Sequence, residues 1–390
     1  MKIKSFFILL CAIGIVSCNK ESKHQDWQVI DANSAVDSKV DAIFDSLQVI
    51  QLEANTESFV GDVHKIVSCQ DYYIFKNVKN TIYVFDHNGR FIANSNSARG
   101  KGKGEFGALL GCCYNPFTKQ IEILTPTSLK FYDIHFKFVK SVIIPTKSPS
   151  GEDQPGIYFD DIYDLSPTRH ILLARGGRGN SGNLYIFDSE EEKIKETISF
   201  DDEIIEAMSN QGVCFCLCNN KVFGFLPYLT NRIYCLGNNN LTPYLAFDFG
   251  DKTITKQHVQ DMPNKTREEQ SLRKKFIRNG PFLYPLTNAI CGNKLFSYIR
   301  NGKDFNDWFF LMYDLESHTT SKFQFYVDKI EKFNIESIGS GNSLYCVCRD
   351  NEVASAFIKT FNKKERTTTT GFTSDSIPNE NIVLLKYTIK

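Results

Sequence analysis

The sequence predicts an all-β fold: a six-bladed β-propeller, closed by pairing of the N-terminal strand with the last blade and carrying one helical insertion. Three observations predict it. A strand-and-turn motif recurs along the chain at spacings near 47 residues. The last copy of the repeat lacks one strand, and a strand of suitable pattern precedes the first copy. One stretch of different composition, residues 251–280, interrupts the series.

The composition limits the class of protein. The 390 residues include 45 basic and 45 acidic residues, so the formal net charge is zero, and 42% of the residues are hydrophobic. A chain this apolar and this evenly charged is not disordered, and it lacks the excess positive charge of a nucleic-acid-binding domain. After the N-terminal segment, the sequence has no run of 18 apolar residues that would span a bilayer as a helix. We therefore expect a globular domain with no nucleic-acid partner.

The N-terminal segment has the features of an export signal. Two lysines precede the apolar residues 6–16, a stretch typical of a signal-peptide core and too short for a stable transmembrane helix. It ends in Ile15-Val16-Ser17-Cys18, which resembles a bacterial lipobox, with the Cys18 thiol as the atom that takes the diacylglyceryl group. We expect residues 1–17 to be a lipoprotein signal peptide and residues 18–40 to be a tether. The alternative is an ordinary secretory peptide with an incidental cysteine.

The repeated motif is an apolar strand that ends in a turn residue. Equivalent positions, spaced 47, 55, 49 and 77 residues apart, are Asp86, Asp133, Asp188, Gly237 and Asp314. The last interval is long because it contains residues 251–280, which are rich in charged and amide side chains and favour a helix; without these 30 residues the interval is 47. A period near 47 made of four short strands is typical of a propeller blade, since each blade buries its faces only against its neighbours.

Within the expected propeller, residues 41–390, the pattern divides each blade into four strands. The strands expected for blades 2 to 5 are residues 110–114, 120–124, 129–133 and 138–144; 159–165, 170–174, 184–188 and 194–200; 213–218, 222–226, 232–236 and 244–249; and 286–291, 295–299, 308–314 and 322–327. The sixth blade begins near Phe333, continues through residues 344–348 and has its third strand at residues 382–389. Its fourth strand is missing.

A strand that could complete the sixth blade lies near the N-terminus. Residues 47–52 alternate apolar and polar side chains, as a half-buried strand does. Pairing them with residues 382–389 would close the ring and remove the two free edges that an open ring exposes. Alternatively, residues 47–52 form only an N-terminal edge strand.

The Gly-rich segment after the first blade carries a family resemblance. Residues 90–106 contain a strand, then Arg99-Gly100-Lys101-Gly102 and Gly104-Glu105-Phe106. With the lipobox and the six blades, this segment resembles the six-bladed β-propeller lipoproteins of Bacteroidota, whose architecture is NHL-like and which carry a turn G-x-G-P-G-E-[FY] at this place; Lys103 stands where that family usually has Pro. The resemblance implies a fold and an envelope location rather than an activity. Asn19 resembles the pattern sorted to the outer membrane, facing either the periplasm or the outside.

Cysteine and histidine are the side chains that most often bind transition metals, and their spacing here does not suggest a metal site. The chain has 12 cysteines; those at positions 214, 216, 218, 346 and 348 alternate along strands, without a histidine or a second pair at a zinc-site spacing. We expect buried, core-filling cysteines, with disulfides as the alternative in an oxidising compartment. The seven histidines show no paired spacing, and no G-x-S-x-G nucleophile elbow is present. We therefore expect no metal and no cofactor, and we identify no catalytic residue.

Loop length places the candidate ligand site. In a four-stranded blade the 1–2 and 3–4 connections lie at one face, and the 2–3 and interblade connections lie at the other. The second face collects the long segments, residues 94–106, 145–156, 175–182, 251–280, 300–307 and 349–379. Binding residues concentrate on long loops held by a rigid scaffold, so we expect the ligand at this face, over the axis. The candidate ligand-binding residues are Arg99, Lys101, Lys103, Glu105, Arg175, Arg178, Arg300, Asp304 and Arg349.

The basic members of this set suggest an anionic ligand, although acidic residues lie nearby in the sequence. The Gly-rich run that begins at Arg99 lacks the Lys-Ser/Thr of a P-loop, so we expect it to form a sharp turn between blades.

Two functions fit these observations. The first is an envelope-anchored, non-catalytic binding or scaffold propeller for a glycan, a peptide or an outer-membrane protein partner, held to the membrane through Cys18. The second is a propeller hydrolase or lyase with an axial active site. The lack of a compact catalytic motif favours the first function, and an enzyme is the alternative.

Overall fold

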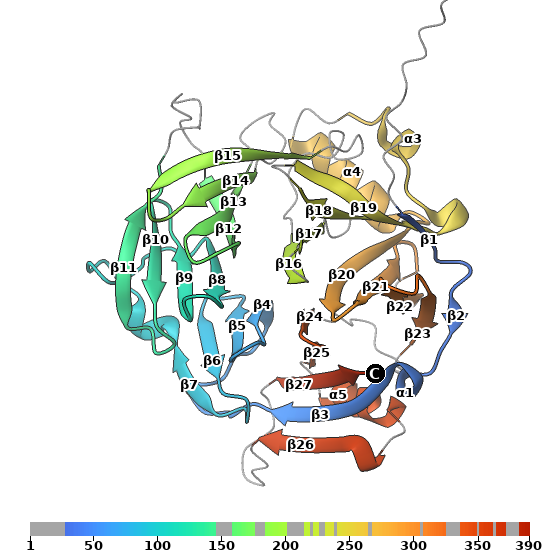
Figure 1. The fold of residues 1–390 in the computed structure, drawn as a ribbon, viewed down its shortest axis with the longest axis horizontal. Helices are drawn as coiled ribbons and strands as arrows, with labels where there is room; N and C mark the ends of the chain where they lie inside the picture. Colours follow the sequence, from blue (N-terminus) through green and yellow to red (C-terminus); the bar gives the residue numbers. More distant parts are fainter. Residues whose placement is uncertain are drawn as a thin grey trace, which may run out of the picture.

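The computed structural model is a six-bladed β-propeller, as the sequence predicted (Figure 1). It describes residues 28–145, 158–175, 184–200, 214–218, 221–225, 231–237, 240–263, 267–304, 307–324, 336–348, 351–361, 364–371 and 382–390. Small antiparallel sheets are arranged in a ring, and in the first five blades the chain runs outward from the innermost strand through four consecutive strands before it enters the next blade.

Blades 1 to 3 each contain four strands. Blade 1 consists of β4 (Val63–Ser68), β5 (Tyr73–Asn77), β6 (Ile82–Phe85) and β7 (Phe91–Asn94). Blade 2 consists of β8 (Gly111–Asn115), β9 (Gln120–Leu124), β10 (Ser128–Tyr132) and β11 (Phe138–Ile143). Blade 3 consists of β12 (Tyr158–Asp164), β13 (Arg169–Arg175), β14 (Leu184–Asp188) and β15 (Lys193–Phe200).

Blades 4 to 6 each include a fifth strand. Blade 4 consists of β16 (Cys214–Cys218), β17 (Lys221–Phe225), β18 (Arg232–Leu236), β19 (Asn240–Asp248) and β1 (Gln28–Asp31). Blade 5 consists of β20 (Leu283–Cys291), β21 (Lys294–Asn301), β22 (Trp308–Asp314), β23 (Thr320–Phe323) and β2 (Val36–Asp37). Blade 6 consists of β24 (Glu336–Ser340), β25 (Ser343–Cys348), β27 (Val383–Ile389), β3 (Phe44–Gln51) and β26 (Thr367–Gly371).

The N-terminal strand closes the ring in blade 6, which confirms the predicted pairing. Strand β3 pairs antiparallel with β27, so that Leu47 lies opposite Tyr387 and Val49 lies opposite Leu385. The side chains of Leu47, Leu385 and Tyr387 are fully buried. On its other side β3 pairs parallel with β26, a strand that the sequence analysis did not predict. Blade 6 is therefore built from both ends of the chain (Figure 1).

Part of the expected tether belongs to the propeller. We assigned residues 18–40 to a tether, but β1 pairs parallel with β19, and β2 pairs parallel with β23. Ile30 is only 2% exposed and packs in one core cluster with Phe247. These short strands cover the outer edges of blades 4 and 5, whose N–H and C=O groups would otherwise be open for pairing. The tether assignment is wrong for residues 28–37.

The helical insertion lies between blades 4 and 5, as predicted. It contains η2 (Gly250–Lys252), α3 (Lys256–Val259) and α4 (Arg267–Asn279). Val259 and Ile277 are fully buried and belong to the same core cluster as residues of blades 5 and 6. Short helices that the sequence analysis did not predict are α1 (Val40–Ile43), η1 (Ser95–Ala98), α5 (Asn351–Thr360) and η3 (Lys364–Arg366). In the described part of the chain, no helix has the length and apolarity needed to cross a membrane.

The hydrophobic core lies between neighbouring blades. Ile74 and Val84 of blade 1, for example, pack with Cys112 and Ile123 of blade 2. Of the seven cysteines that the structure describes in full, six are buried, and none of the seven is in a disulfide bond. This confirms the core-filling role for the six buried residues.

The first prediction tests closure of the ring. Truncation after Asn379 removes β27 and leaves β3 and β25 without their shared partner, so we expect the whole ring to lose its cooperative structure rather than a tail. Circular dichroism and thermal unfolding measure this. Removal of Lys390 alone, which lies beyond β27, is the control and should leave the melting temperature unchanged. A truncated chain with a melting transition close to the wild-type one contradicts the closure.

Candidate functional site

The innermost strands β4, β8, β12, β16, β20 and β24 surround the axis of the ring (Figure 1). Three of them, β4, β12 and β20, carry a β-bulge. The register of β4 shifts between Val63 and Lys65, and that of β12 shifts between Phe159 and Asp161. A bulge changes the direction of the side chains that follow it and is common next to functional sites. Lys65 follows the bulge after Val63, and Asp161 follows the bulge after Phe159.

Lys65 and Asp161 form an ion pair that joins the inner strands of blades 1 and 3. The Lys65 Nζ lies 2.8 Å from Oδ1 and 2.7 Å from Oδ2 of Asp161, and it also donates to the carbonyl oxygen of Cys112 in blade 2 at 3.3 Å. The Tyr163 hydroxyl donates to Asp161 Oδ2 at 3.1 Å. Burial alone would lower the pKa of Lys65, but the Asp161 carboxylate outweighs burial and raises it. The lysine is therefore a fixed positive charge that ties three blades together.

Further charged and aromatic side chains lie around this ion pair. Lys76 of β5 is the cross-strand partner of Lys65 and is only 6% exposed. The exposed His64 is the extra residue of the β4 bulge, and its pKa is lowered by burial of its ring and by the charges of Lys76 and Lys65, against the opposing effect of Asp161. We call His64, Lys65, Lys76, Asp161 and Tyr163 the axial cluster.

The axial cluster lies toward the face predicted to bind the ligand. Strand β4 begins at an interblade connection, and β5 ends at a 2–3 connection. Both connections are at the face with the long segments, so His64 and Lys76 are closer to it than to the opposite face. None of the five residues of the cluster was among the candidates chosen from the sequence.

Two of the predicted residues, Arg99 and Glu105, form hydrogen bonds with the backbone of the Gly-rich turn and of a neighbouring turn. The Arg99 guanidinium donates to the carbonyl oxygen of Lys79 at 3.1 Å, and Glu105 Oε2 accepts from the Gly102 N–H at 2.8 Å. At Gly100, where φ is +154°, a Cβ would lie 1.9 Å from Glu105 Oε2, so only glycine fits. Arg99 and Glu105 thus stabilise a sharp turn between blades 1 and 2.

The other predicted residues are spread around the ring. Lys101 and Lys103 are exposed on the same Gly-rich turn. Arg300 and Asp304 lie at or just after the end of β21 in blade 5, on the opposite side of the ring (Figure 1). Of Arg175 only the backbone is described, at the end of β13, and two more candidates lie outside the described residues: Arg178 and Arg349. The structure thus does not bring the described candidates together into one site.

A second polar cluster, which the sequence analysis missed, is buried between blades 2 and 3. His170 Nδ1 lies 2.7 Å from Asp164 Oδ1 and 3.2 Å from Glu122 Oε2. The His170 and Glu122 side chains are fully buried, and that of Asp164 is 3% exposed. Burial lowers the pKa of His170, but hydrogen bonds to the two carboxylates raise it overall to about 9. Burial and the neighbouring Asp164 raise the pKa of Glu122 to about 7.

Ser189, His170 and Asp164 have the residue types of a hydrolase triad, but their geometry is structural. In a triad the serine hydroxyl donates to the imidazole. Here the Ser189 Oγ, 3.0 Å from His170 Nε2, donates to the carbonyl oxygen of Thr168 at 3.2 Å, and Ser189 is only 3% exposed. A protonated His170 fits this arrangement, because its Nδ1–H donates to Asp164 and its Nε2–H donates to the Ser189 Oγ.

The same carboxylates lie close to a thiol. Cys113 Sγ and carboxylate oxygens of Glu122 and Asp164 fall within 4.8 Å of one another, which is a possible metal-ligand set. The His170 imidazolium already supplies positive charge to both carboxylates there. We therefore assign these residues to the blade 2 and blade 3 interface.

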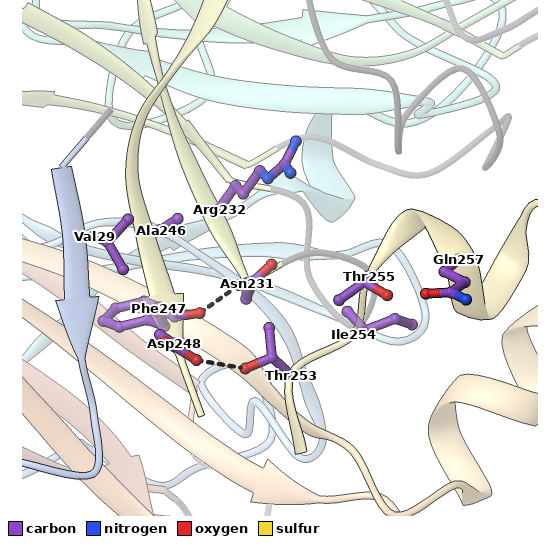
Figure 2. Close-up of a pocket in the computed structure, with 10 residues that line it drawn as sticks. All are labelled: Val29, Asn231, Arg232, Ala246, Phe247, Asp248, Thr253, Ile254, Thr255 and Gln257. Atoms are coloured by element: carbon purple, nitrogen blue, oxygen red, sulfur yellow. Dashed lines mark hydrogen bonds between the residues drawn. The ribbon is translucent and has the colours of Figure 1, made fainter. Parts of the chain in front are cut away.

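A pocket of about 410 Å³ lies at the rim of blade 4 (Figure 2). It is lined by residues of β1, β18 and β19 and by the segment that leads into α3. The Asn231 amide donates to the carbonyl oxygen of Phe247, and the Thr253 hydroxyl donates to Asp248 at 3.1 Å (Figure 2). The first hydrogen bond lies within blade 4, and the second holds the segment that leads into α3 against this blade, so we do not treat the pocket as the main site.

Comparison with known proteins places the chain in a family. A family model described as a domain of unknown function, DUF4934, matches residues 27–388. The chain belongs to this family. None of the curated proteins matches it.

Two solved structures resemble this DUF4934 protein over nearly their whole length. One, from Bacteroides fragilis NCTC 9343 and provisionally described as an exported protein, is 15% identical with a TM-score of 0.65, over 93% of this chain and 99% of that one. The other, a member of the DUF4221 family from Bacteroides vulgatus, is 10% identical with a TM-score of 0.55, over 89% of this chain and 97% of that one. At these identities the likeness establishes the fold.

The second prediction follows from the buried His170 cluster. The folded-state pKa values of Glu122 and His170, about 7 and about 9, lie above the ordinary values of 4.5 and 6.5. The folded state therefore binds more protons than the unfolded state, and its stability falls as pH rises from about 4.5 to about 9. Urea unfolding at pH 5, 7 and 9 should show a loss of about 1–3 kcal/mol from these groups.

Matched variants assign this pH dependence to the cluster. Glu122→Gln removes one raised pKa, so the decrease in stability between pH 5 and 7 should become smaller. Glu190→Gln, at an exposed position, should leave it unchanged. Equal pH profiles for wild type and Glu122→Gln would show that the cluster does not titrate in this range.

Proposed function

We propose that this DUF4934 protein is an envelope-anchored lipoprotein whose propeller binds a glycan, a peptide or a partner protein without chemical conversion. The observation that carries the proposal is the axial cluster. It combines charged groups and an aromatic ring at the axis, on a rigid ring and toward the face with the long connections. Such a surface on a rigid scaffold is typical of binding sites.

The residues around the axis favour binding over catalysis. The Lys65 ammonium and the Asp161 carboxylate are hydrogen-bonded to each other, and the Tyr163 hydroxyl donates to the same carboxylate. Each group is held in place by its neighbours, and none is a nucleophile next to a free base. The arrangement suits recognition by preformed charges, because little side-chain entropy is lost when a ligand binds.

The anchor would hold blade 4 close to the membrane. The described chain starts at Gln28, in β1 on the outer edge of blade 4. Nine residues, 19–27, lie between it and Cys18, and at full extension the ten residue-to-residue steps reach about 35 Å. A lipid on Cys18 would therefore keep the propeller within about one domain diameter of the bilayer.

The third prediction concerns the anchor. Replacement of Cys18 by Ala removes the thiol that would take the diacylglyceryl group, so the protein should lose its lipid and move from the membrane fraction to the soluble fraction. Metabolic labelling with a fatty-acid probe and cell fractionation measure both effects. Cys11→Ala, within the apolar segment, is the control and should keep the label. Equal labelling of wild type and Cys18→Ala would refute lipidation at this residue.

The fourth prediction separates binding from catalysis. The purified chain without its first 26 residues is incubated with arrays of envelope polysaccharides, other polysaccharides and peptides, and both retention and product formation are followed. We expect at least one class to be retained and recovered intact. Turnover of the retained compound would overturn the non-catalytic proposal, and no retention of any class would overturn the binding proposal.

A further inference from the structure

Lys76 is a buried lysine that has no counter-ion in the described part of the chain. Its side chain is 6% exposed, and no ion pair or hydrogen bond of its ammonium group is found among the described residues. Its cross-strand partner is another lysine, Lys65. Like charges directly opposite in a sheet are unfavourable. The stem of the Lys76 side chain is buried, and its ammonium group reaches solvent. The fold therefore keeps an uncompensated positive charge at this point.

The neighbours of Lys76 do not neutralise it. Among the titratable groups, its charge acts on His64 and on the thiol of Cys112. Asp161 is the acidic group of the axial cluster, and both of its carboxylate oxygens are hydrogen-bonded to Lys65. With the histidine neutral and the Lys65–Asp161 pair compensated, the cluster carries one net positive charge. One monovalent anion would balance it.

The burial of Lys76 limits the shape of that anion. A carboxylate at the end of a flexible stem of one or two methylenes reaches a largely buried lysine more easily than one attached directly to a sugar ring. The surrounding wall also suits a peptide. Strand β4 pairs with β5 on one side, and its other edge faces the axis (Figure 1), where an extended peptide would find main-chain donors and acceptors.

We infer that the axial end of blade 1 receives an acidic side chain, Asp or Glu, of a peptide or protein partner, and that its carboxylate pairs with Lys76. This inference rests on the proposed binding function and specifies the ligand class. His64, exposed at the bulge beside Lys76, would contact the partner near the same carboxylate. Lys65 and Asp161 hold the inner strands in position and make no net contribution to the charge.

The test uses a peptide with a single carboxylate. Acetylated and amidated Gly-Gly-Glu-Gly-Gly is titrated against the purified propeller and followed by NMR, with the Gln peptide and tetragalacturonate as comparison probes. We expect the Glu peptide to bind at least tenfold more tightly than the Gln peptide. Lys76→Met keeps the apolar stem and roughly the length of the side chain. It should weaken the binding of the Glu peptide at least tenfold. Lys137→Met, at an exposed position in blade 2, should bind like wild type.

Thermal unfolding shows whether Lys76→Met is folded, so that its binding can be compared with that of wild type. Because Lys76→Met removes an uncompensated charge opposite Lys65, its melting temperature should equal or exceed that of wild type, so that weaker binding cannot be ascribed to unfolding. If Lys76→Met unfolds, Lys76→Gln takes its place, with the same expected loss of binding. Equal binding of the Glu and Gln peptides, full binding by either Lys76 variant, or no binding at 10 mM peptide overturns the inference. Tighter binding of tetragalacturonate through Lys76 overturns the peptide assignment.

The two proposals fail in different ways. A ligand from the arrays that binds independently of Lys76 leaves the proposed function intact and refutes the inference. A ligand that is turned over refutes the non-catalytic function, whatever Lys76 binds.

Discussion

The pairing of β3 with β27 is the contact on which the rest of the molecule depends. A propeller blade has a stable core only where a neighbour covers each of its faces, and blade 6 is the neighbour of both blade 5 and blade 1. Its sheet is complete only when residues from both ends of the chain are hydrogen-bonded in register, with Leu47 opposite Tyr387. The closed arrangement of the six inner strands around the axis follows from this pairing.

The fold was predictable because the blade repeat produces a local sequence motif that recurs along the chain. Third strands that end in Asp or Gly recur at regular spacing, and the missing strand of the last blade indicated how the ring closes. The short strand β1 was not predicted, since its four residues acquire a strand conformation only by pairing with the distant β19. The same holds for β26, whose threonines pair with β3 across the whole length of the chain. Such elements depend on tertiary pairing rather than on local propensity.

The candidate site was less predictable because its members come from different blades. Lys65 and Asp161 are separated by 96 residues, and neither belongs to a recognisable motif. Selection by loop length favoured Arg99 and Glu105, but these side chains bond to the backbone of nearby turns. One signal was present in the sequence: the polar pair His64-Lys65 at the start of an otherwise apolar inner strand. A charge at such a position needs a partner across the axis, although the sequence does not say which.

Blade 6 also determines when folding can finish. Strand β3 leaves the ribosome early, and its partner β27 is among the last segments to be made, so the N-terminal strand has an unsatisfied edge during almost the whole of synthesis. Contacts of such long sequence separation form slowly, and exposed strand edges at that stage promote association between chains. Completion of the ring is therefore a late event that requires the full chain. Until then the ring around the axis is incomplete, and a ligand that needs the complete ring binds only molecules that have finished folding.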